Sequence, residues 1–264
     1  MAAVDPGRAG RRDFGKILTD PIAIIVLYCL IVSALFLAFP IIDLWVSGAF
    51  YDPLSGFTAA DSPALRLLRA SGDWAMEIVI VVLLLSLVGK IALPSRRSLV
   101  PPRVSLFLLS TLIVAAGLLV NVVLKDHWGR PRPSNVTDFG GDFPYVEIWR
   151  ISNYCVKNCS FVAGEASSAI WLTAIAFVVP SRYRWPVLIV TGLFALALSV
   201  NRIAFGGHFL SDVMLSWGLT ALVIAILYRV FFIRPPAWLK NERLEAGLAR
   251  LGNAIRRPFS ARAS

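Results

Sequence analysis

Six apolar blocks run along the chain, and each is bounded by prolines, charges or aromatic residues. The blocks cover residues 22–40, 74–93, 104–124, 164–180, 185–201 and 211–233. Each has about 17–23 residues with few charges, which is the length a helix needs to cross about 30 Å of hydrocarbon. The pattern therefore predicts an all-α integral membrane bundle of about six transmembrane helices.

The segments outside these blocks are polar and basic. Residues 1–20 form the N-terminus, and residues 234–264 mix leucine and isoleucine with arginine. We expect the first block to remain as a helix, because it is longer than a signal-peptide core and no small-residue cleavage site follows it. The C-terminal tail is typical of an amphipathic helix on an anionic membrane surface. The sequence thus predicts one membrane domain, residues 21–233, between two basic cytoplasmic segments.

The charge balance gives an expected orientation. Hydrophobic residues make up 57% of the 264 residues and the net charge is +10. A basic soluble domain would point to a nucleic-acid partner, which we do not expect here, because the basic residues lie between and outside the apolar blocks. Most of them fall on the side of the N-terminus, so the positive-inside rule places both termini in the cytoplasm of a bacterial inner membrane. Regions 34–73, 125–163 and 202–210 then lie together on the periplasmic face.

Two cysteines lie in the second of these outer regions. Cys155 and Cys159 are separated by Val-Lys-Asn, and outside the cytoplasm such a pair can form a disulfide. Free thiols are the alternative, whereas a metal site would need more ligands than two thiols without a nearby histidine. Cys29 lies in an apolar block, where a small packing residue is expected.

Polar residues gather at three places, each at the outer end of a predicted helix: residues 125–133, 160–167 and 201–212. Together they supply lysine and arginine cations, a histidine with a carboxylate four residues later, and a glycine at a helix start. This set suits a phosphoryl group, because cations neutralise a phosphate dianion and the charge of its transition state. The free N–H groups at a helix start also favour an anion.

The third cluster contains a candidate nucleophile. His208 can attack phosphorus if its other ring nitrogen has an orienting partner. Asp212 lies four residues later. If His208 starts the sixth helix, the two side chains share one helix face.

Two of the clusters have the spacing of known motifs, and through them the chain resembles the type-2 phosphatidic acid phosphatase superfamily. The first and third motifs of that superfamily read Lys-x6-Arg-Pro and Ser-Arg-x5-His-x3-Asp. The residues that match them with the correct spacing are Lys125, Arg132, Pro133, Arg202, His208 and Asp212. The resemblance covers about residues 100–233, and the six-helix layout extends it to the whole membrane part.

The resemblance implies a role for each matched residue. In that superfamily the histidine forms a phosphohistidine, the aspartate orients it, and the cations hold the phosphate oxygens without a metal. His208 would be the nucleophile and Asp212 its orienting partner. The phosphate would be bound by Lys125, Arg132, Arg202 and Gly164. No metal and no other cofactor is expected.

The second motif departs from the superfamily pattern. Val-Ala-Gly-Glu stands where Pro-Ser-Gly-His is usual, so Ala163 lacks the phosphate-binding hydroxyl and Glu165 replaces the histidine that protonates the leaving group. In the third motif Asn201 replaces serine. Glu165 is our candidate general acid, with His127 as an alternative. In a third possibility, the leaving group needs little protonation and Glu165 is only a carboxylate favoured by the helix dipole.

These observations predict a lipid phosphatase that hydrolyses a phosphate monoester or pyrophosphate of a membrane lipid at the periplasmic face. A site at the bilayer edge is reached most easily from within the leaflet, so the expected partners are a lipid phosphate and the bilayer. Lipid A phosphate, undecaprenyl pyrophosphate and phosphatidylglycerol phosphate are candidates, and we favour lipid A or a related glycolipid. The alternatives are a lipid phosphotransferase and a non-catalytic lipid-binding protein. The sequence leaves the oligomeric state open.

Overall fold

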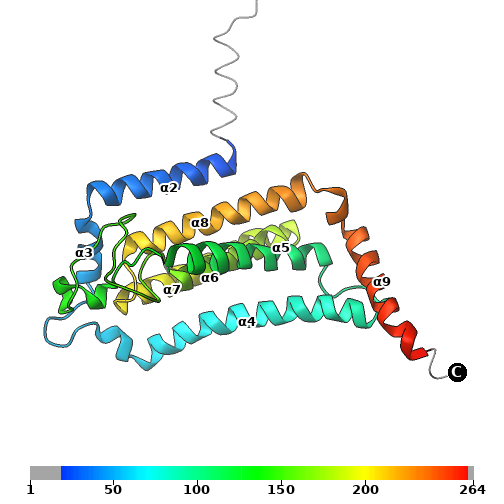
Figure 1. Ribbon diagram of the computed structural model, residues 1–264, viewed down its shortest axis with the longest axis horizontal. Helices are drawn as coiled ribbons and strands as arrows, with labels where there is room; N and C mark the ends of the chain where they lie inside the picture. The colour runs from blue at the N-terminus through cyan, green and yellow to red at the C-terminus, as the bar shows by residue number, and fades with distance from the viewer. Residues whose placement is uncertain (1–18, 126, 261–264) are drawn as a thin grey trace, which may run out of the picture.

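The structure is a computed structural model that describes residues 19–125 and 127–260, and within them it is a bundle of helices with no β-strand (Figure 1). The basic N-terminus predicted from the sequence lies almost wholly outside the described residues. The α-helices are α2 (Pro21–Ala38), α3 (Ile41–Gly48), α4 (Pro63–Ala92), α5 (Pro102–Leu112), α6 (Gly164–Trp171), α7 (Ser181–Ala204), α8 (Leu210–Tyr228) and α9 (Asn241–Ser260). Two π-helical segments, η2 (Ile113–Lys125) and η6 (Arg229–Ile233), continue α5 and α8. Short 3₁₀ segments are η1 (Thr58–Asp61), η3 (Pro133–Asn135), η4 (Thr137–Phe139), η5 (Leu172–Phe177) and η7 (Ala237–Leu239).

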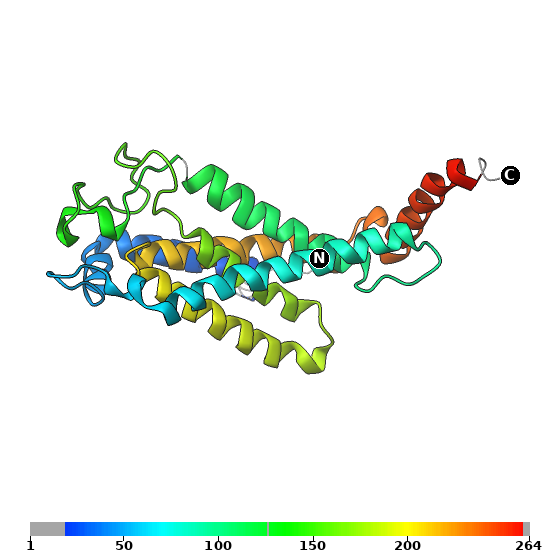
Figure 2. The ribbon, with the colours of Figure 1, turned by 90° about the horizontal axis from the view of Figure 1, so that it is seen from below.

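Five helices in the described residues are long and apolar enough to cross a membrane: α2, α4, α5 with η2, α7, and α8 with η6. In the most apolar 18-residue stretch of each helix, 11% of the residues of α2 and 17% of those of α4 are buried, compared with 50% of those of α8. Figures 1 and 2 accordingly show α2 and α4 on opposite sides of the bundle, with α8 between them. The apolar side chains that α2 and α4 turn outward suit a hydrocarbon environment. The predicted all-α membrane fold is confirmed.

The fourth predicted block, residues 164–180, differs from the prediction. It folds as α6 and η5, with eight and six residues, and is too short to count among the five candidate spans. It is also enclosed by its neighbours, because Ala166, Ala169 and Ala174 are buried and the segment packs against α7 and α8. Small residues let helix backbones approach closely. The apolar composition of this block therefore reflects burial inside the protein.

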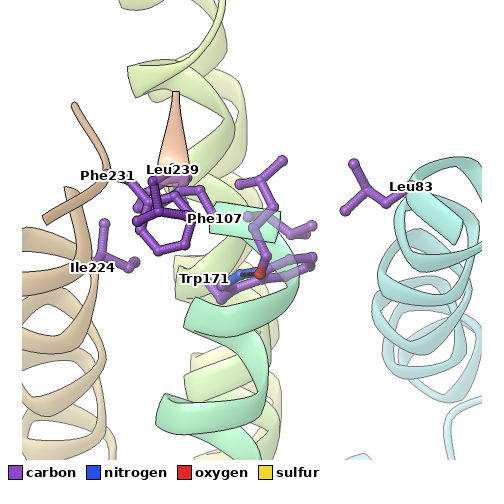
Figure 3. Close-up of a cluster of buried hydrophobic side chains, with 9 residues drawn as sticks. Leu83, Phe107, Trp171, Ile224, Phe231 and Leu239 are labelled. Carbon is purple, nitrogen blue, oxygen red and sulfur yellow. Dashed lines mark hydrogen bonds between the residues drawn. The ribbon is translucent and has the colours of Figure 1, made fainter. Parts of the chain in front are cut away.

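A hydrophobic cluster holds together the half of the bundle that lies toward α9 (Figure 3). Phe107 of α5, Trp171 of α6 and Ile224 of α8 are buried together in it. The indole N–H of Trp171 donates to the carbonyl of Leu108 at 3.1 Å and to the hydroxyl of Thr111 at 3.0 Å. Because this end of α6 is fixed, the position of its first residues at the other end of the bundle is fixed as well.

The two ends of the bundle differ in kind. The long connection over residues 127–163, α3, and the turn between α7 and α8 lie at one end, and α9 lies at the other (Figures 1 and 2). α9 packs against α4 and α5, and it covers most of the tail for which the sequence predicts an amphipathic helix. Contact between α9 and a membrane surface stays a prediction.

Candidate active site

The three polar clusters of the sequence meet at the end of the bundle that carries the long connection. Backbone hydrogen bonds join them in pairs. The N–H of Ser134 donates to the carbonyl of Gly206 at 3.0 Å, and the N–H of Ser160 donates to the carbonyl of Arg130 at 2.9 Å. The N–H of Ala163 donates to the carbonyl of Asp212 at 3.3 Å. Segments from distant parts of the chain therefore form one rigid site.

His208 lies in the turn between α7 and α8, and only 1% of it is exposed. Its Nδ1 atom is 2.8 Å from the carbonyl oxygen of Ser160. Burial holds the pKa of His208 well below its usual value, and three nearby cations lower it further: Arg202, Lys125 and Arg132. The imidazole is therefore neutral. Because a carbonyl oxygen can only accept, the single ring proton is on Nδ1 and Nε2 keeps its lone pair.

The Asp212 carboxylate has partners other than the one that the spacing predicts. α8 begins at Leu210, so His208 precedes the helix and the shared-face argument does not hold. Oδ2 of Asp212 accepts from the backbone N–H of Phe209 at 3.0 Å and from the hydroxyl of Ser160 at 2.5 Å. Asp212 and His208 are therefore linked through Ser160, whose hydroxyl donates to Asp212 and whose carbonyl binds the imidazole.

A fully buried arginine holds Asp212 from the other side. Arg130, Asp43 and Asp212 all have side chains with no exposed area. Arg130 donates to Asp212 at 2.6 Å and to Asp43 of α3 at 2.8 Å. Asp43 in turn accepts the backbone N–H of Ser211 at 2.8 Å. Although burial alone would lower the pKa of Arg130, these two carboxylates raise it, so the guanidinium stays charged and links α3 to the first turn of α8.

The three predicted phosphate-binding cations lie near enough to His208 to lower its pKa. Arg202 is in the last turn of α7 with 5% of the residue exposed, and a Cβ at Gly207 would overlap its guanidinium. Glycine at that position therefore admits the arginine to the site. Arg132 donates twice to the carbonyl of Asn158, at 3.1 and 2.8 Å. Lys125 is the last residue of η2.

Gly164 is the first residue of α6, as predicted. A Cβ at this position would lie 2.8 Å from Oδ1 of Asn121 and 3.6 Å from Nζ of Lys125. The absence of a side chain therefore lets the lysine approach the first turn of the helix, where free backbone N–H groups favour an anion. The helix start and the lysine together form one wall of the candidate site.

Glu165 is paired with two arginines. Arg69 of α4 donates to both of its carboxylate oxygens, at 2.8 and 3.1 Å. Nε of Arg202 lies 3.1 Å from Oε2, but its N–H is not aligned for a hydrogen bond and Nε is buried without a partner among the described residues. A buried donor without a partner is costly. Nε of Arg202 therefore has a donor that the described side chains leave unused.

The alternative acid, His127, is exposed, and its Nδ1 lies 2.9 Å from the carbonyl of Val122 in the preceding turn. This contact holds the ring against the end of the preceding segment η2. The structure gives His127 no contact with Glu165 or His208 within the residues it describes.

A disulfide closes the part of the long connection that enters the site. Cys155 and Cys159 are bonded, with their Cα atoms 5.7 Å apart, which confirms the disulfide favoured over free thiols. Within and just after this short loop lie the two carbonyls that hold site side chains. Asn158 binds Arg132 and Ser160 binds His208. The disulfide loop therefore positions the side chains of both Arg132 and His208.

Several residues of this site were not singled out from the sequence. Arg69 was missed because the apolar block begins at residue 74, although Ser62-Pro63 is a helix-start signal that would have extended the helix across it. Asp43 stands alone in an apolar stretch, and an isolated carboxylate in such surroundings indicates a buried partner. Ser160 carried no signal, because its contribution is a backbone carbonyl.

Comparisons with known proteins agree with this geometry. Residues 105–236 match the model of the PAP2 superfamily. A lipid A 4'-phosphatase of Rhizobium leguminosarum is 36% identical over 74% of this chain and 89% of its own length. One from Francisella tularensis subsp. novicida is 32% identical over 76% and 93% of the two chains.

The fold has a solved counterpart. The crystal structure of a transmembrane PAP2-type phosphatidylglycerolphosphate phosphatase from Bacillus subtilis is 20% identical, with a TM-score of 0.52 over 79% of this chain and 94% of that one. This likeness shows the shared fold alone, and the family follows from the matched residues and the relatives. The lysine and the two arginines of the two spaced motifs lie near the buried imidazole of His208. With these residues matched, the chain belongs to the PAP2 superfamily and is a membrane phosphatase.

Proposed function

We propose that this protein removes a phosphate group from a lipid A-type glycolipid through a phosphohistidine intermediate on His208. The observation that carries the proposal is the hydrogen bond from Nδ1–H of His208 to the carbonyl of Ser160. It leaves the Nε2 lone pair of a neutral imidazole for attack, within a set of three cations suited to a phosphate dianion.

The proposed reaction has two steps. Nε2 of His208 attacks phosphorus, and the bond to the leaving oxygen breaks, with its electron pair going to that oxygen. Lys125, Arg132 and Arg202 hold the three other oxygens and neutralise their charge. Water then attacks the phosphohistidine, releases inorganic phosphate and restores the neutral imidazole. Asp212 is a positioning residue, because it holds Ser160 rather than the reacting atoms.

The substrate class rests on two supports. Both relatives that match most of this chain are named lipid A 4'-phosphatases. The site also lies at one end of a bundle whose outer helices expose apolar side chains, so a lipid can present its phosphate there without leaving the leaflet.

The periplasmic placement of the site has independent support. Most Lys and Arg residues outside the apolar blocks are on the opposite side of the predicted membrane. The site end also carries a disulfide, and disulfides persist in oxidising compartments such as the periplasm. We therefore place both ends of the chain in the cytoplasm of a bacterial inner membrane.

The hydrogen bonds of Glu165 bear on whether it protonates the leaving group. Both of its oxygens accept from Arg69, which has no acceptor of its own. A protonated carboxyl would place its O–H against a guanidinium, so this arrangement is that of a carboxylate. It favours a role for Glu165 other than proton donation.

The test is phosphate release from a panel of lipid phosphates in detergent, with EDTA present. We expect wild-type protein to release phosphate from lipid A, and His208→Ala to abolish release. His127→Ala is the matched control, because this exposed histidine lies outside the site and its loss should leave the rate within about twofold. Transfer of the phosphate to a second lipid would identify a transferase, and no turnover of any lipid phosphate would contradict the proposal.

A trapping experiment tests the intermediate separately. Radiolabelled substrate quenched in base should leave label on wild-type protein that acid removes, as expected for a phosphohistidine. His127→Ala should retain the label and His208→Ala should lose it. Turnover by a His208→Ala variant, or label that survives acid, would refute a phosphohistidine at this residue.

A further inference from the structure

A cavity of about 170 Å³ lies directly beside the phosphate site, between α4, η2, α6 and α7. It is smaller than the roughly 300–1,000 Å³ of pockets that enclose a drug-sized ligand, so it can hold one small polar group and not a lipid. Its polar lining consists of Arg69, Asp73, Asn121, Lys125, Glu165 and Ser168.

The cavity shares a wall with the phosphate site but lies away from the nucleophile. Lys125 and Gly164 line it, whereas His208 is not among the described residues that do. Phosphoryl transfer needs the attacking atom and the leaving oxygen roughly in line on opposite sides of phosphorus. Because this cavity borders the phosphate site through Lys125 and Gly164 and not through His208, it is the candidate place for the leaving group.

We propose that this cavity is the leaving-group subsite, and that Arg69, held there by Glu165, stabilises the negative charge on the departing oxygen. The inference rests on the proposed function, which supplies a phosphorylated sugar as substrate. A sugar alkoxide is a poor leaving group, so a cation that meets it lowers the barrier. The hydroxyls around it can pair with Asp73, Asn121 and Ser168.

The contacts of Arg69 match this role. Its guanidinium uses Nε and one Nη atom on the two oxygens of Glu165, at 3.1 and 2.8 Å. This bidentate contact fixes the plane of the guanidinium. The side chain of Arg69 is 46% exposed, so its remaining N–H groups are open to a ligand. Asp73 follows one turn later on the same face of α4, and its charge also favours the cation.

Glu165 joins Arg69 to the phosphate site. Its Oε2 lies 3.1 Å from Nε of Arg202, so one carboxylate contacts both the arginine of the phosphate site and the arginine of the cavity. Arg69 comes from α4, outside the residues that match the superfamily model. The chain thus places the charge of a separate helix at the leaving-group side of the phosphate.

The protons balance without an acidic side chain. When the P–O bond breaks, the leaving oxygen takes the electron pair and Arg69 donates a hydrogen bond to it. A water molecule then gives this oxygen a proton. The hydroxide that remains attacks the phosphohistidine, so one water is consumed in the whole reaction and the histidine is restored.

The test compares two leaving groups on the full-length protein in detergent. p-Nitrophenyl phosphate releases a stable phenolate that needs little help, whereas a phosphorylated glycolipid releases a sugar alkoxide that needs much. We expect Arg69→Ala to lower kcat on the glycolipid at least tenfold more than on p-nitrophenyl phosphate. Glu165→Gln should change the ratio of the two rates in the same direction, and the double variant should be no worse than Arg69→Ala. Arg69→Lys, which keeps a cation, should bring the ratio of the two rates part of the way back to the wild-type value.

Arg66→Ala is the matched control. Arg66 is on the same helix, one turn earlier, and its guanidinium donates to the carbonyl of Asp61. This variant should leave both rates unchanged. An equal loss on both substrates in Arg69→Ala would overturn the inference, and so would a change of ratio in Glu165→Gln alone, which would make Glu165 the proton donor. Either result, obtained with a wild-type protein that turns over the glycolipid, would overturn this inference and leave the proposed function intact. If wild-type protein does not turn over the glycolipid, the proposed function itself is contradicted.

Discussion

Replacement of Arg130 by methionine should destabilise the protein more than any other single change near the site. Arg130 is the only cation in direct contact with Asp43 and Asp212 among the described residues, and all three side chains are fully buried. Methionine fills a similar volume but leaves two buried carboxylates without a counter-charge. Removing one partner of a buried ion pair costs about 3–5 kcal/mol.

Neutralising one of the two carboxylates should reduce the free energy of unfolding by less. Asp43→Asn removes one of two negative charges and leaves a neutral pair of Arg130 with Asp212, and the amide still accepts a hydrogen bond. A lost charge-assisted hydrogen bond is worth about 1.5–3 kcal/mol. The expected order of thermal stability is therefore wild type, then Asp43→Asn, then Arg130→Met.

The assay is thermal unfolding in detergent, followed by tryptophan fluorescence and by monodisperse recovery on size exclusion. For a chain of this size about 1 kcal/mol corresponds to roughly 2–4 °C, so Arg130→Met should lower the midpoint by about 6–20 °C. Equal midpoints for Arg130→Met and wild type would refute the reasoning, and so would a larger loss in Asp43→Asn. Either result would mean that the buried carboxylates do not depend on the arginine charge.

Three further predictions concern activity. Because the pKa of His208 lies well below its usual value, its imidazole stays neutral in mildly acidic solution. The pH at which kcat/KM begins to decrease on the acid side should therefore be lower than about 6.5. Arg132→Ala removes a cation that opposes protonation, so the limb should move to higher pH; a shift to lower pH would contradict the cause assigned. Cys155→Ser should lower kcat about tenfold, since small displacements of reacting groups are costly. The control Cys29→Ser should leave kcat unchanged. An equal decrease in kcat for both variants would refute a positioning role for the disulfide. Gly164→Ala should also lower kcat about tenfold in a steady-state assay, because its Cβ would lie 2.8 Å from a neighbouring amide oxygen; wild-type activity would mean that this close approach is dispensable.

The class of the protein and the identity of its reactive groups could be predicted from the sequence. Apolar blocks of membrane length are a local property of the chain, and so is the spacing of residues within a motif. For this reason the helical membrane fold, the PAP2 superfamily and the convergence of the motif residues at one end of the bundle followed from the sequence alone. The burial of the fourth block among other helices did not, because an apolar block predicts burial without distinguishing lipid from protein. Most residues of 164–176 are buried by the neighbouring helices, whereas Phe177 is exposed.

The partners of those groups were decided by the tertiary structure. The argument from four-residue spacing assumed that His208 is helical, but α8 begins two residues later. The actual partner of the imidazole is a carbonyl 48 positions away in the chain. Arg130 is buried because α3 brings a carboxylate to it across 87 positions, and Glu165 is paired because α4 passes beside α6. Such contacts depend on how the helices pack and on where side chains point, and neither is encoded in the spacing of residues along a single segment.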